Sequence, residues 1–268
     1  MVRVGLVGCG TIGSQLALTL HRDYRHVARV IALHDQDRTQ AETLARRLIP
    51  RPSIVPLSTL LRRSHLVIEA ASVDVASRVV RQALRLHCSM LVMSVGGLLR
   101  DRTWQRLARR SGVKVYIPSG ALAGLDGIKA LAVGRIRRAS LTTRKPPRAL
   151  ANAPYVRQKR LRLERLTRPS LLFEGPPRAV VQAFPQNTNV AAALALASGA
   201  PESRLRIRVV ADPTIRMNIH ELDVQGECGR MQCTIRSRPS ANPKTSELAV
   251  RSAIATLQRI FDPVSIGT

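Results

Sequence analysis

The sequence predicts an α/β protein, with a doubly wound parallel sheet first and a smaller α/β (α+β) domain with an open mixed sheet second. Up to about residue 116, short apolar β-type runs alternate with helical patterns, which is typical of a parallel sheet covered by helices. Farther along, three strand-like runs follow one another without a helix between them. A glycine-rich turn directly after the first apolar run marks the start of the parallel part.

The composition is that of a folded protein, because 45% of the 268 residues are apolar. No apolar run approaches the roughly 20 residues that cross a bilayer, and the first strand pattern leaves no room for a signal peptide. We therefore expect a cytoplasmic protein without a membrane partner. The cysteines Cys9, Cys88, Cys228 and Cys233 form no C-x-x-C pair, so neither a metal site nor a disulfide framework is expected.

The formal charge of +26 raises the question of nucleic-acid binding. Five of the 43 basic residues are lysine and 38 are arginine, and they are spread along the chain. Only 3% of the residues are aromatic, which leaves few platforms for base stacking. No nucleic-acid-binding module is recognisable, so the arginine content indicates a composition bias with a weak attraction for anionic substrates.

Residues 2–7 form the first apolar run, and residues 8–13 (GCGTIG) match G-x-G-x-x-G. The first glycine permits the tight turn, the second lets the backbone approach a pyrophosphate, and the third lets the next helix pack closely. The start of that helix offers unpaired N–H groups to the phosphates. The pattern predicts a dinucleotide site that is formed by Gly8, Gly10, Thr11, Ile12 and Gly13.

A second strand pattern at residues 27–33 leads to Asp35, which lies 22 residues after Gly13. An acid at this place binds the adenosine ribose of a dinucleotide. Its carboxylate repels a 2′-phosphate and favours NAD, whereas Arg38, three residues on, is suited to accept that phosphate. The expected cofactor is therefore NAD or NADP.

Strand patterns continue at residues 53–56, 65–69, 89–93 and 113–116, with helical patterns at 40–48, 75–86 and 101–110. Ligands bind beyond the carboxyl ends of parallel strands. The loops at residues 70–72 and 94–97 should therefore line one crevice with the glycine turn. Ala71 and Ser72 are the candidate cofactor contacts there.

The second part begins with small residues at 117–126, a helix at 123–133 and a strand at 136–142. Pro146 and Pro147 follow shortly after, and prolines end regular structure. The sequence predicts a rigid loop before them, on which the adjacent Arg144 and Lys145 bind a carboxylate. A solvated turn is the alternative.

Residues 148–168 are strongly basic and weakly patterned, which predicts an exposed excursion. The chain should return to the core at 171–173 and 180–183, before a buried helix at 190–197. Asn187 and its neighbours at the start of that helix form a cap or hold a ligand.

Three strands of a largely antiparallel sheet are expected at residues 205–210, 215–225 and 231–236. His220 lies in the middle strand, and from these residues alone a structural and a catalytic role both remain open. Residues 239–246 precede an amphipathic helix that should begin at Pro243 or Lys244.

Together these motifs resemble the L-aspartate dehydrogenases over nearly the whole chain. The resemblance rests on the order and spacing of residues 8–13, 94–97, 118–126, 142–147, 187–190, His220 and 242–246. Two features depart from the family pattern, namely Gly97, where the family usually has alanine, and the basic stretch at 148–168.

The resemblance implies a Rossmann domain at residues 1–118, completed by a C-terminal helix at 243–268. It also implies a catalytic and oligomerisation domain at residues 119–242, whose hydrophobic open sheet joins subunits into a homodimer or larger oligomer. His220 matches the catalytic histidine of the family, and Ala123 and Asn189 match positions that contact the cofactor.

The implied reaction oxidises L-aspartate to iminoaspartate, or aminates oxaloacetate with ammonia in reverse, within NAD biosynthesis. A hydride leaves the substrate Cα only when the amine is neutral, so a general base must first take a proton from the ammonium. An unperturbed histidine pKa of ~6.5 suits that task and favours His220. The candidates for binding the two substrate carboxylates and orienting the amine are Arg144, Lys145, Ser119, Asn187, Lys244 and Thr245.

Two other interpretations remain at this point. A related two-domain oxidoreductase, such as a homoserine dehydrogenase, would act on another substrate. A basic, non-catalytic protein that binds NAD or nucleic acid would show no turnover.

Overall fold

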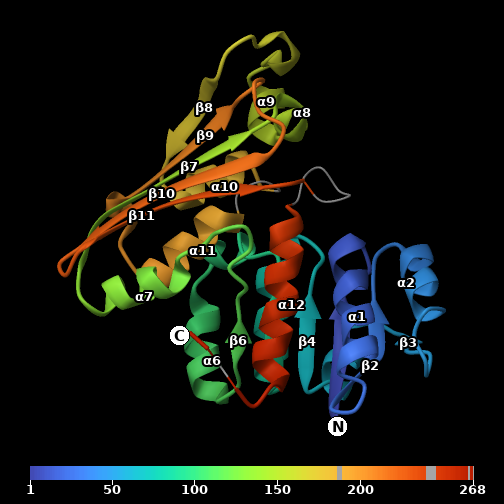
Figure 1. Cartoon of the computed structure of the whole chain (residues 1–268). Coiled ribbons are helices and arrows are strands. Elements are labelled where there is room, and N and C mark those ends of the chain that lie inside the picture. Colours follow the sequence, from blue (N-terminus) through green and yellow to red (C-terminus); the bar gives the residue numbers. More distant parts are fainter. Residues whose placement is uncertain (186–188, 240–245, 265, 268) are drawn as a thin grey trace. The chain divides into compact units, whose positions relative to one another are not determined.

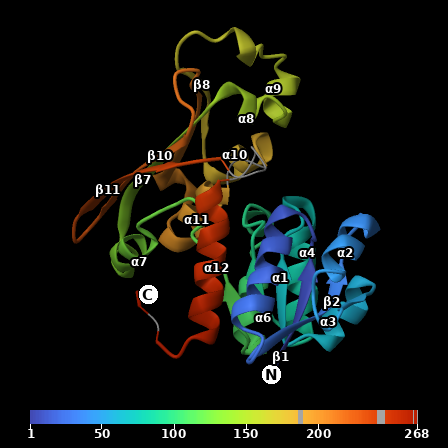
Figure 2. The same ribbon diagram turned by 45° about the vertical axis from the view of Figure 1, so that its right-hand side comes forward.

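The computed structural model describes residues 1–185, 189–239, 246–264 and 266–267 (Figures 1 and 2). The chain divides into two compact units, Met1–Pro118 with Val250–Ser265 and Ser119–Ala249 with Ile266–Thr268. Each unit is built on a sheet of its own.

The first unit contains a six-stranded parallel sheet with the order β3-β2-β1-β4-β5-β6. Its strands are β1 Val2–Val7, β2 Ala28–His34, β3 Ser53–Ile54, β4 Leu66–Glu69, β5 Ser89–Val92 and β6 Val115–Tyr116. The helices are α1 Thr11–Asp23, α2 Arg38–Ala45, α3 Leu57–Arg63, α4 Val73–Arg85, α5 Gly97–Arg100 and α6 Thr103–Ser111. The strand order reverses direction at β1, which confirms the doubly wound parallel sheet.

In the core of the first unit, the sheet packs against a helix from the N-terminal part of the chain and a helix from its C-terminal part. Leu6 of β1 is fully buried, and α1 buries Leu16 and Leu20, which lie four residues apart on one face. Helix α12 (Glu247–Phe261) adds Leu257 to the same apolar cluster. Near this cluster the ring of Phe261 lies 5.5 Å from that of Tyr24. The last helix of the chain is therefore part of the first core (Figure 1).

The second unit contains a five-stranded mixed sheet with the order β11-β10-β7-β9-β8. Its strands are β7 Ile136–Lys145, β8 Ser170–Gly175, β9 Leu205–Ala211, β10 Asn218–Gly226 and β11 Arg230–Ser237. The helices are α7 Leu125–Val133, α8 Pro147–Leu150, α9 Pro154–Gln158, η1 Leu163–Arg165, α10 Pro177–Ala183, α11 Asn189–Ser198 and η2 Glu202–Arg204. Strands β7 and β9 are parallel and the other pairs antiparallel, which confirms the open mixed sheet.

Several local expectations were wrong. The stretch at 148–168 is not a simple exposed excursion, because it forms α8, α9 and η1 and buries Leu150, Val156 and Leu163. Helix α3 was not expected, since its pattern is only seven residues long. Helix α12 begins at Glu247 rather than at residue 243 or 244.

The open face of the second sheet is polar, contrary to the hydrophobic face that was expected. Helices α7 and α10 contact the sheet, and the opposite face presents Ser140, Thr142 and Arg144 of β7 beside Glu221 and Asp223 of β10. Arg144 Nε lies 3.0 Å from Glu221 Oε2, so an ion pair crosses these two strands.

Candidate functional site

The glycine turn of the first unit packs tightly against the neighbouring strand end. Gly8 has a φ of +94°, and a Cβ there would lie 2.5 Å from the carbonyl oxygen of Ala70. A Cβ at Gly13 would lie 1.9 Å from the oxygen of Gly8. A Cβ at Gly10 would meet no atom of the described chain nearer than Gln40 Oε1, at 3.6 Å. Packing within the chain therefore requires glycine at the first and third positions, whereas the second faces open space.

Asp35 lies just past β2 and points toward this turn. Its Oδ2 accepts a hydrogen bond from the backbone N–H of Cys9 at 2.5 Å, and its Oδ1 accepts one from Asp37 N at 2.9 Å. Arg38 is turned elsewhere, since its Nε pairs with Glu42 Oε1 at 2.9 Å and its side chain is 82% exposed. Asp35 and Arg38 are the two residues that the sequence assigned to the 2′ position of the adenosine ribose. Of these two, only Asp35 lies at the glycine turn.

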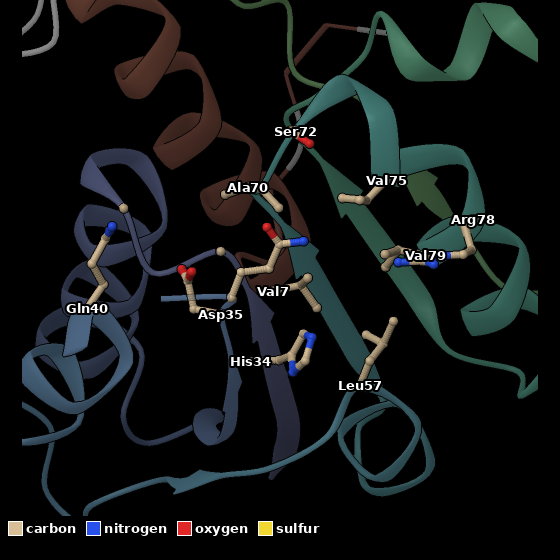
Figure 3. A pocket seen from close by; sticks show the side chains of 14 residues that line it. Val7, His34, Asp35, Gln40, Leu57, Ala70, Ser72, Val75, Arg78 and Val79 are labelled. Carbon is tan, nitrogen blue, oxygen red and sulfur yellow. The ribbon is translucent and has the colours of Figure 1, made fainter. Parts of the chain in front are cut away.

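A cavity of about 260 Å³ opens beyond the carboxyl ends of β1, β2 and β4 (Figure 3). Figure 3 shows Asp35 and Gln40 on one side of it and Val75, Arg78 and Val79 of α4 on the other. The full lining is Val7, Gly8, Gly10, His34, Asp35, Gln36, Gln40, Leu57, Ala70, Ala71, Ser72, Val75, Arg78 and Val79. Apolar walls with a few polar groups are typical of small-molecule sites.

Four polar lining residues were not predicted from the sequence, namely His34, Gln36, Gln40 and Arg78. The i, i+3, i+4 spacing of Val75, Arg78 and Val79 places these three side chains on one face of α4. That spacing was a signal available in the sequence. Thr11 and Ile12 form the first positions of α1, directly after Gly10.

Glu69, the last residue of β4, is a fully buried carboxylate that joins two loops. Its Oε1 accepts hydrogen bonds from Ala71 N and Ser94 Oγ, both at 2.9 Å, and its Oε2 accepts one from Ser94 N at 3.1 Å. Burial raises the pKa of Glu69, and the hydrogen bonds from Ser94 and Ala71 oppose that rise. The loops after β4 and β5, which the sequence predicted to line one crevice, are thus connected through one side chain.

The second unit brings His220 and Lys145 to the same face of its sheet. His220 of β10 pairs with Thr143 of β7, and its Nδ1 lies 3.1 Å from Thr143 Oγ1. Lys145 lies two residues beyond Thr143, so its side chain leaves the strand on the same side. Both His220 and Lys145 are buried, with 2% and 4% of their surfaces exposed.

Burial shifts the pKa values of both groups. It lowers the pKa of Lys145 from its usual value to about 8. It also lowers the pKa of His220 to about 3, and the nearby charge of Lys145 adds to this shift. The expectation of an unperturbed histidine is therefore wrong, because His220 is neutral across the physiological range.

The expected cation loop at Arg144 and Lys145 does not exist. Strand β7 continues through Lys145, and the two side chains point to opposite faces of the sheet. Lys145 is on the buried face with His220, whereas Arg144 pairs with Glu221 on the open face.

The other candidates from the sequence also lie in or beside the second unit. Ser119 and Ala123 precede α7, and Asn189 is the first residue of α11. Asn187, Lys244 and Thr245 lie outside the described residues. Among the residues that the structure describes, no group of three metal-ligating side chains is found, and no helix there is long and apolar enough to span a membrane.

Two family models match the chain. Residues 8–118 match the model described as "Homoserine dehydrogenase, NAD binding domain", and residues 126–260 match "Aspartate dehydrogenase, C-terminal".

Curated relatives match over the full length. The L-aspartate dehydrogenase of Methanosarcina mazei is 42% identical over 275 residues, with 100% of both chains covered. That of Bradyrhizobium diazoefficiens is 33% identical over 267 residues, covering 100% of this chain and 94% of the relative.

Among solved structures, the aspartate dehydrogenase of Thermotoga maritima matches with a TM-score of 0.73 and 22% identity, covering 100% of both chains. A homoserine dehydrogenase from Thiobacillus denitrificans matches with a TM-score of 0.59 and 15% identity, covering 98% of this chain and 74% of that one. Both likenesses support the fold.

Proposed function

Since the chain belongs to the L-aspartate dehydrogenase family, we propose that it oxidises L-aspartate to iminoaspartate with NAD or NADP, or aminates oxaloacetate in reverse. The observation that carries the proposal is the buried pair of His220 and Lys145 on one sheet face, in a chain that matches named L-aspartate dehydrogenases end to end. Oxidation of an anionic amino acid requires a base that takes a proton from its ammonium and a cation that binds its carboxylate.

The first unit fits a pyridine nucleotide. The open space at Gly10 leaves room for a pyrophosphate, and the N–H groups of Thr11 and Ile12 lie at the start of α1 to bind it. The lined cavity beside Asp35 suits the adenosine end, with Ala71 and Ser72 at its rim. Bound there, the nucleotide supplies a hydride acceptor. Ala123 and Asn189 are the proposed contacts from the second unit.

We propose a preference for NAD over NADP. The carboxylate of Asp35 lies where a 2′-phosphate would meet its negative charge, and Arg38 is engaged with Glu42 on the surface. Arg78 of the cavity lining is the alternative partner for an added phosphate.

In this proposal His220 is the general base. Nδ1 is engaged with Thr143, which leaves Nε2 to take a proton from the substrate ammonium. The low pKa keeps His220 unprotonated before the substrate binds. Two substrate carboxylates close by then favour the imidazolium by their charge, which raises the pKa of His220 as the proton arrives.

Lys145 is the proposed anchor for one carboxylate. A buried ammonium forms stronger charge-assisted hydrogen bonds than an exposed one, because water does not compete. Ser119, Asn187, Lys244 and Thr245 remain proposed contacts for the rest of the substrate. Arg144 is no longer favoured, since it lies on the other face of the sheet.

We further propose a cytoplasmic homodimer or larger oligomer that feeds NAD biosynthesis. The polar open face of the second sheet would form the contact through ion pairs and hydrogen bonds rather than through apolar burial. Association would then weaken as the salt concentration rises.

The test is absorbance at the band of reduced nicotinamide, with purified protein and either NAD or NADP at alkaline pH. L-Aspartate should support turnover, faster with NAD, whereas glutamate, alanine and homoserine should not. Turnover with homoserine in place of aspartate would indicate a homoserine dehydrogenase. NAD binding without turnover on any of these substrates would contradict the proposal.

A further inference from the structure

One buried polar side chain of the second unit has no hydrogen-bond partner among the described residues. Asn218, the first residue of β10, has an exposed fraction of 0%. Neither its Oδ1 nor its Nδ2 is hydrogen-bonded to any atom in the described part of the chain. A buried amide without hydrogen-bond partners lowers the stability of the fold. Both Oδ1 and Nδ2 of Asn218 are therefore available to a ligand.

The strand register places this amide beside His220 and Lys145. Asn218 and His220 are two residues apart on β10 and both belong to its buried face. His220 pairs with Thr143 on the antiparallel β7, so the next position on the same face sets Asn218 opposite Lys145. Directly opposite side chains in such a ladder have Cβ atoms about 4.5–5.5 Å apart.

The other neighbour of Asn218 is also polar. Asn218 pairs with Ser237 of β11, whose Oγ accepts a hydrogen bond from Ser246 Oγ at 2.8 Å. Both serines are buried. Lys145, Asn218 and Ser237 therefore form a row across three strands at one end of the buried face, whereas Leu141 and Leu222 continue that face as apolar core.

We infer that Asn218 is a substrate-binding residue that holds both ends of an α-amino-acid group. Its Nδ2 donates to a substrate carboxylate oxygen, and its Oδ1 accepts from the substrate amine. The inference rests on the proposed function and adds a recognition element to it. One amide that contacts carboxylate and amine together distinguishes aspartate from a dicarboxylate without nitrogen.

The test compares wild type with Asn218→Leu, which is close in size and lacks both polar groups, and with Asn218→Asp, which keeps Oδ1 and replaces the donor with a negative charge. Gln158→Leu, which also removes an amide but at an exposed position of α9, is the control. We expect the KM for aspartate to rise at least about tenfold in Asn218→Leu, and more in Asn218→Asp, with the KM for NAD changed less than about twofold. The control should match wild type.

Two further readouts separate a binding role from a structural one. Removing orphaned polar atoms from a buried position does not destabilise a fold, so the Tm of Asn218→Leu should equal or exceed that of wild type. Succinate, which lacks the amine, titrated into the NAD-saturated enzyme should lose less affinity from this change than aspartate does.

An unchanged KM for aspartate in both variants of Asn218 would overturn the inference while leaving the proposed function intact. If wild type shows no aspartate turnover, the proposed function fails first. Calorimetric titrations of aspartate and of succinate into wild type and into Asn218→Leu then decide the inference alone. If wild type and Asn218→Leu bind aspartate with equal affinity, the inference is overturned. If the variant binds aspartate more weakly, and loses less affinity for succinate, the inference is supported.

Discussion

Glu69 and Asn218 are both buried polar side chains, and their hydrogen bonds differ completely. The carboxylate of Glu69 receives donors from Ala71 and Ser94, so it serves the fold by connecting two loops. The amide of Asn218 makes none with the described part of the chain. Since an unmet buried polar group costs stability, the fold explains the burial of Glu69, whereas we assign Asn218 to substrate binding.

His220 makes a testable contribution to the pH dependence of stability. In the unfolded chain its imidazole binds a proton below about pH 6.5, whereas in the folded protein its pKa is about 3. Between these values the unfolded state binds more protons, so folding loses stability as the pH falls, by up to roughly 1.4 kcal/mol per pH unit. Above about pH 6.5 this contribution vanishes.

We therefore expect the Tm of His220→Gln, relative to wild type, to rise as the pH is lowered from about 7.5 to about 5. Turnover of aspartate should fall by at least about 100-fold, the range that general-base catalysis contributes. His26→Gln, at an exposed position outside the site, is the control and should leave turnover at the wild-type level. A pH-independent Tm difference for His220→Gln would show that His220 titrates normally in the folded protein.

Strand β7 shows why element ends are hard to predict. Its inward positions run Ala139, Leu141, Thr143 and Lys145, so the apolar alternation stops two positions before the strand does. The pattern predicted a loop at 143–147, with Pro146 and Pro147 as its cause. In the structure the prolines end the strand, and Lys145 is its last residue.

The start of α5 carries a second element-level prediction, at Gly97. A Cβ at this position would lie 2.4 Å from Val73 O and 2.9 Å from Ala76 Cβ, both of α4. The contact with backbone cannot be relieved by a side-chain rotation. Alanine at this position should therefore destabilise the protein, by about 1–3 kcal/mol.

The measurement is urea unfolding of Gly97→Ala beside Gly229→Ala, a control position where a Cβ would meet no described atom within 4 Å. The urea midpoint of Gly97→Ala should be lower than that of wild type, and the midpoint of Gly229→Ala should equal that of wild type within experimental error. Equal midpoints for wild type and Gly97→Ala would mean that α4 and α5 separate at little cost.

The net charge of the whole chain acts over a longer distance than any single ion pair. Seventeen acidic residues cannot neutralise 43 basic ones, so the formal net charge is +26. The resulting positive field attracts anionic substrates, and salt screens it.

We expect kcat/KM for oxaloacetate to fall as salt is raised from about 0.01 M to about 1 M, over which the Debye length shrinks from roughly 30 Å to 3 Å. The fall should be smaller for aspartate, whose ammonium cancels one of two carboxylate charges. Ammonia is kept saturating in the reverse assay. Salt profiles that coincide for the two substrates would contradict steering by the net charge.

Local patterns in the sequence were sufficient for the sheet class, the glycine turn and the acid at Asp35, because each depends on residues near one another in the chain. The order and spacing of the motifs selected His220 as the candidate base, and that role stays a prediction. Contacts between residues that are far apart in the sequence could not be predicted from these local patterns. Thr143 and His220, 77 positions apart, meet only through strand pairing. The extension of β7 through Lys145 puts Arg144 and Lys145 on opposite faces of the sheet, and the assembled sheet buries Asn218 without a partner among the described residues. The pKa of His220 follows from burial and from the charge of Lys145, and both arise only when the sheet is assembled.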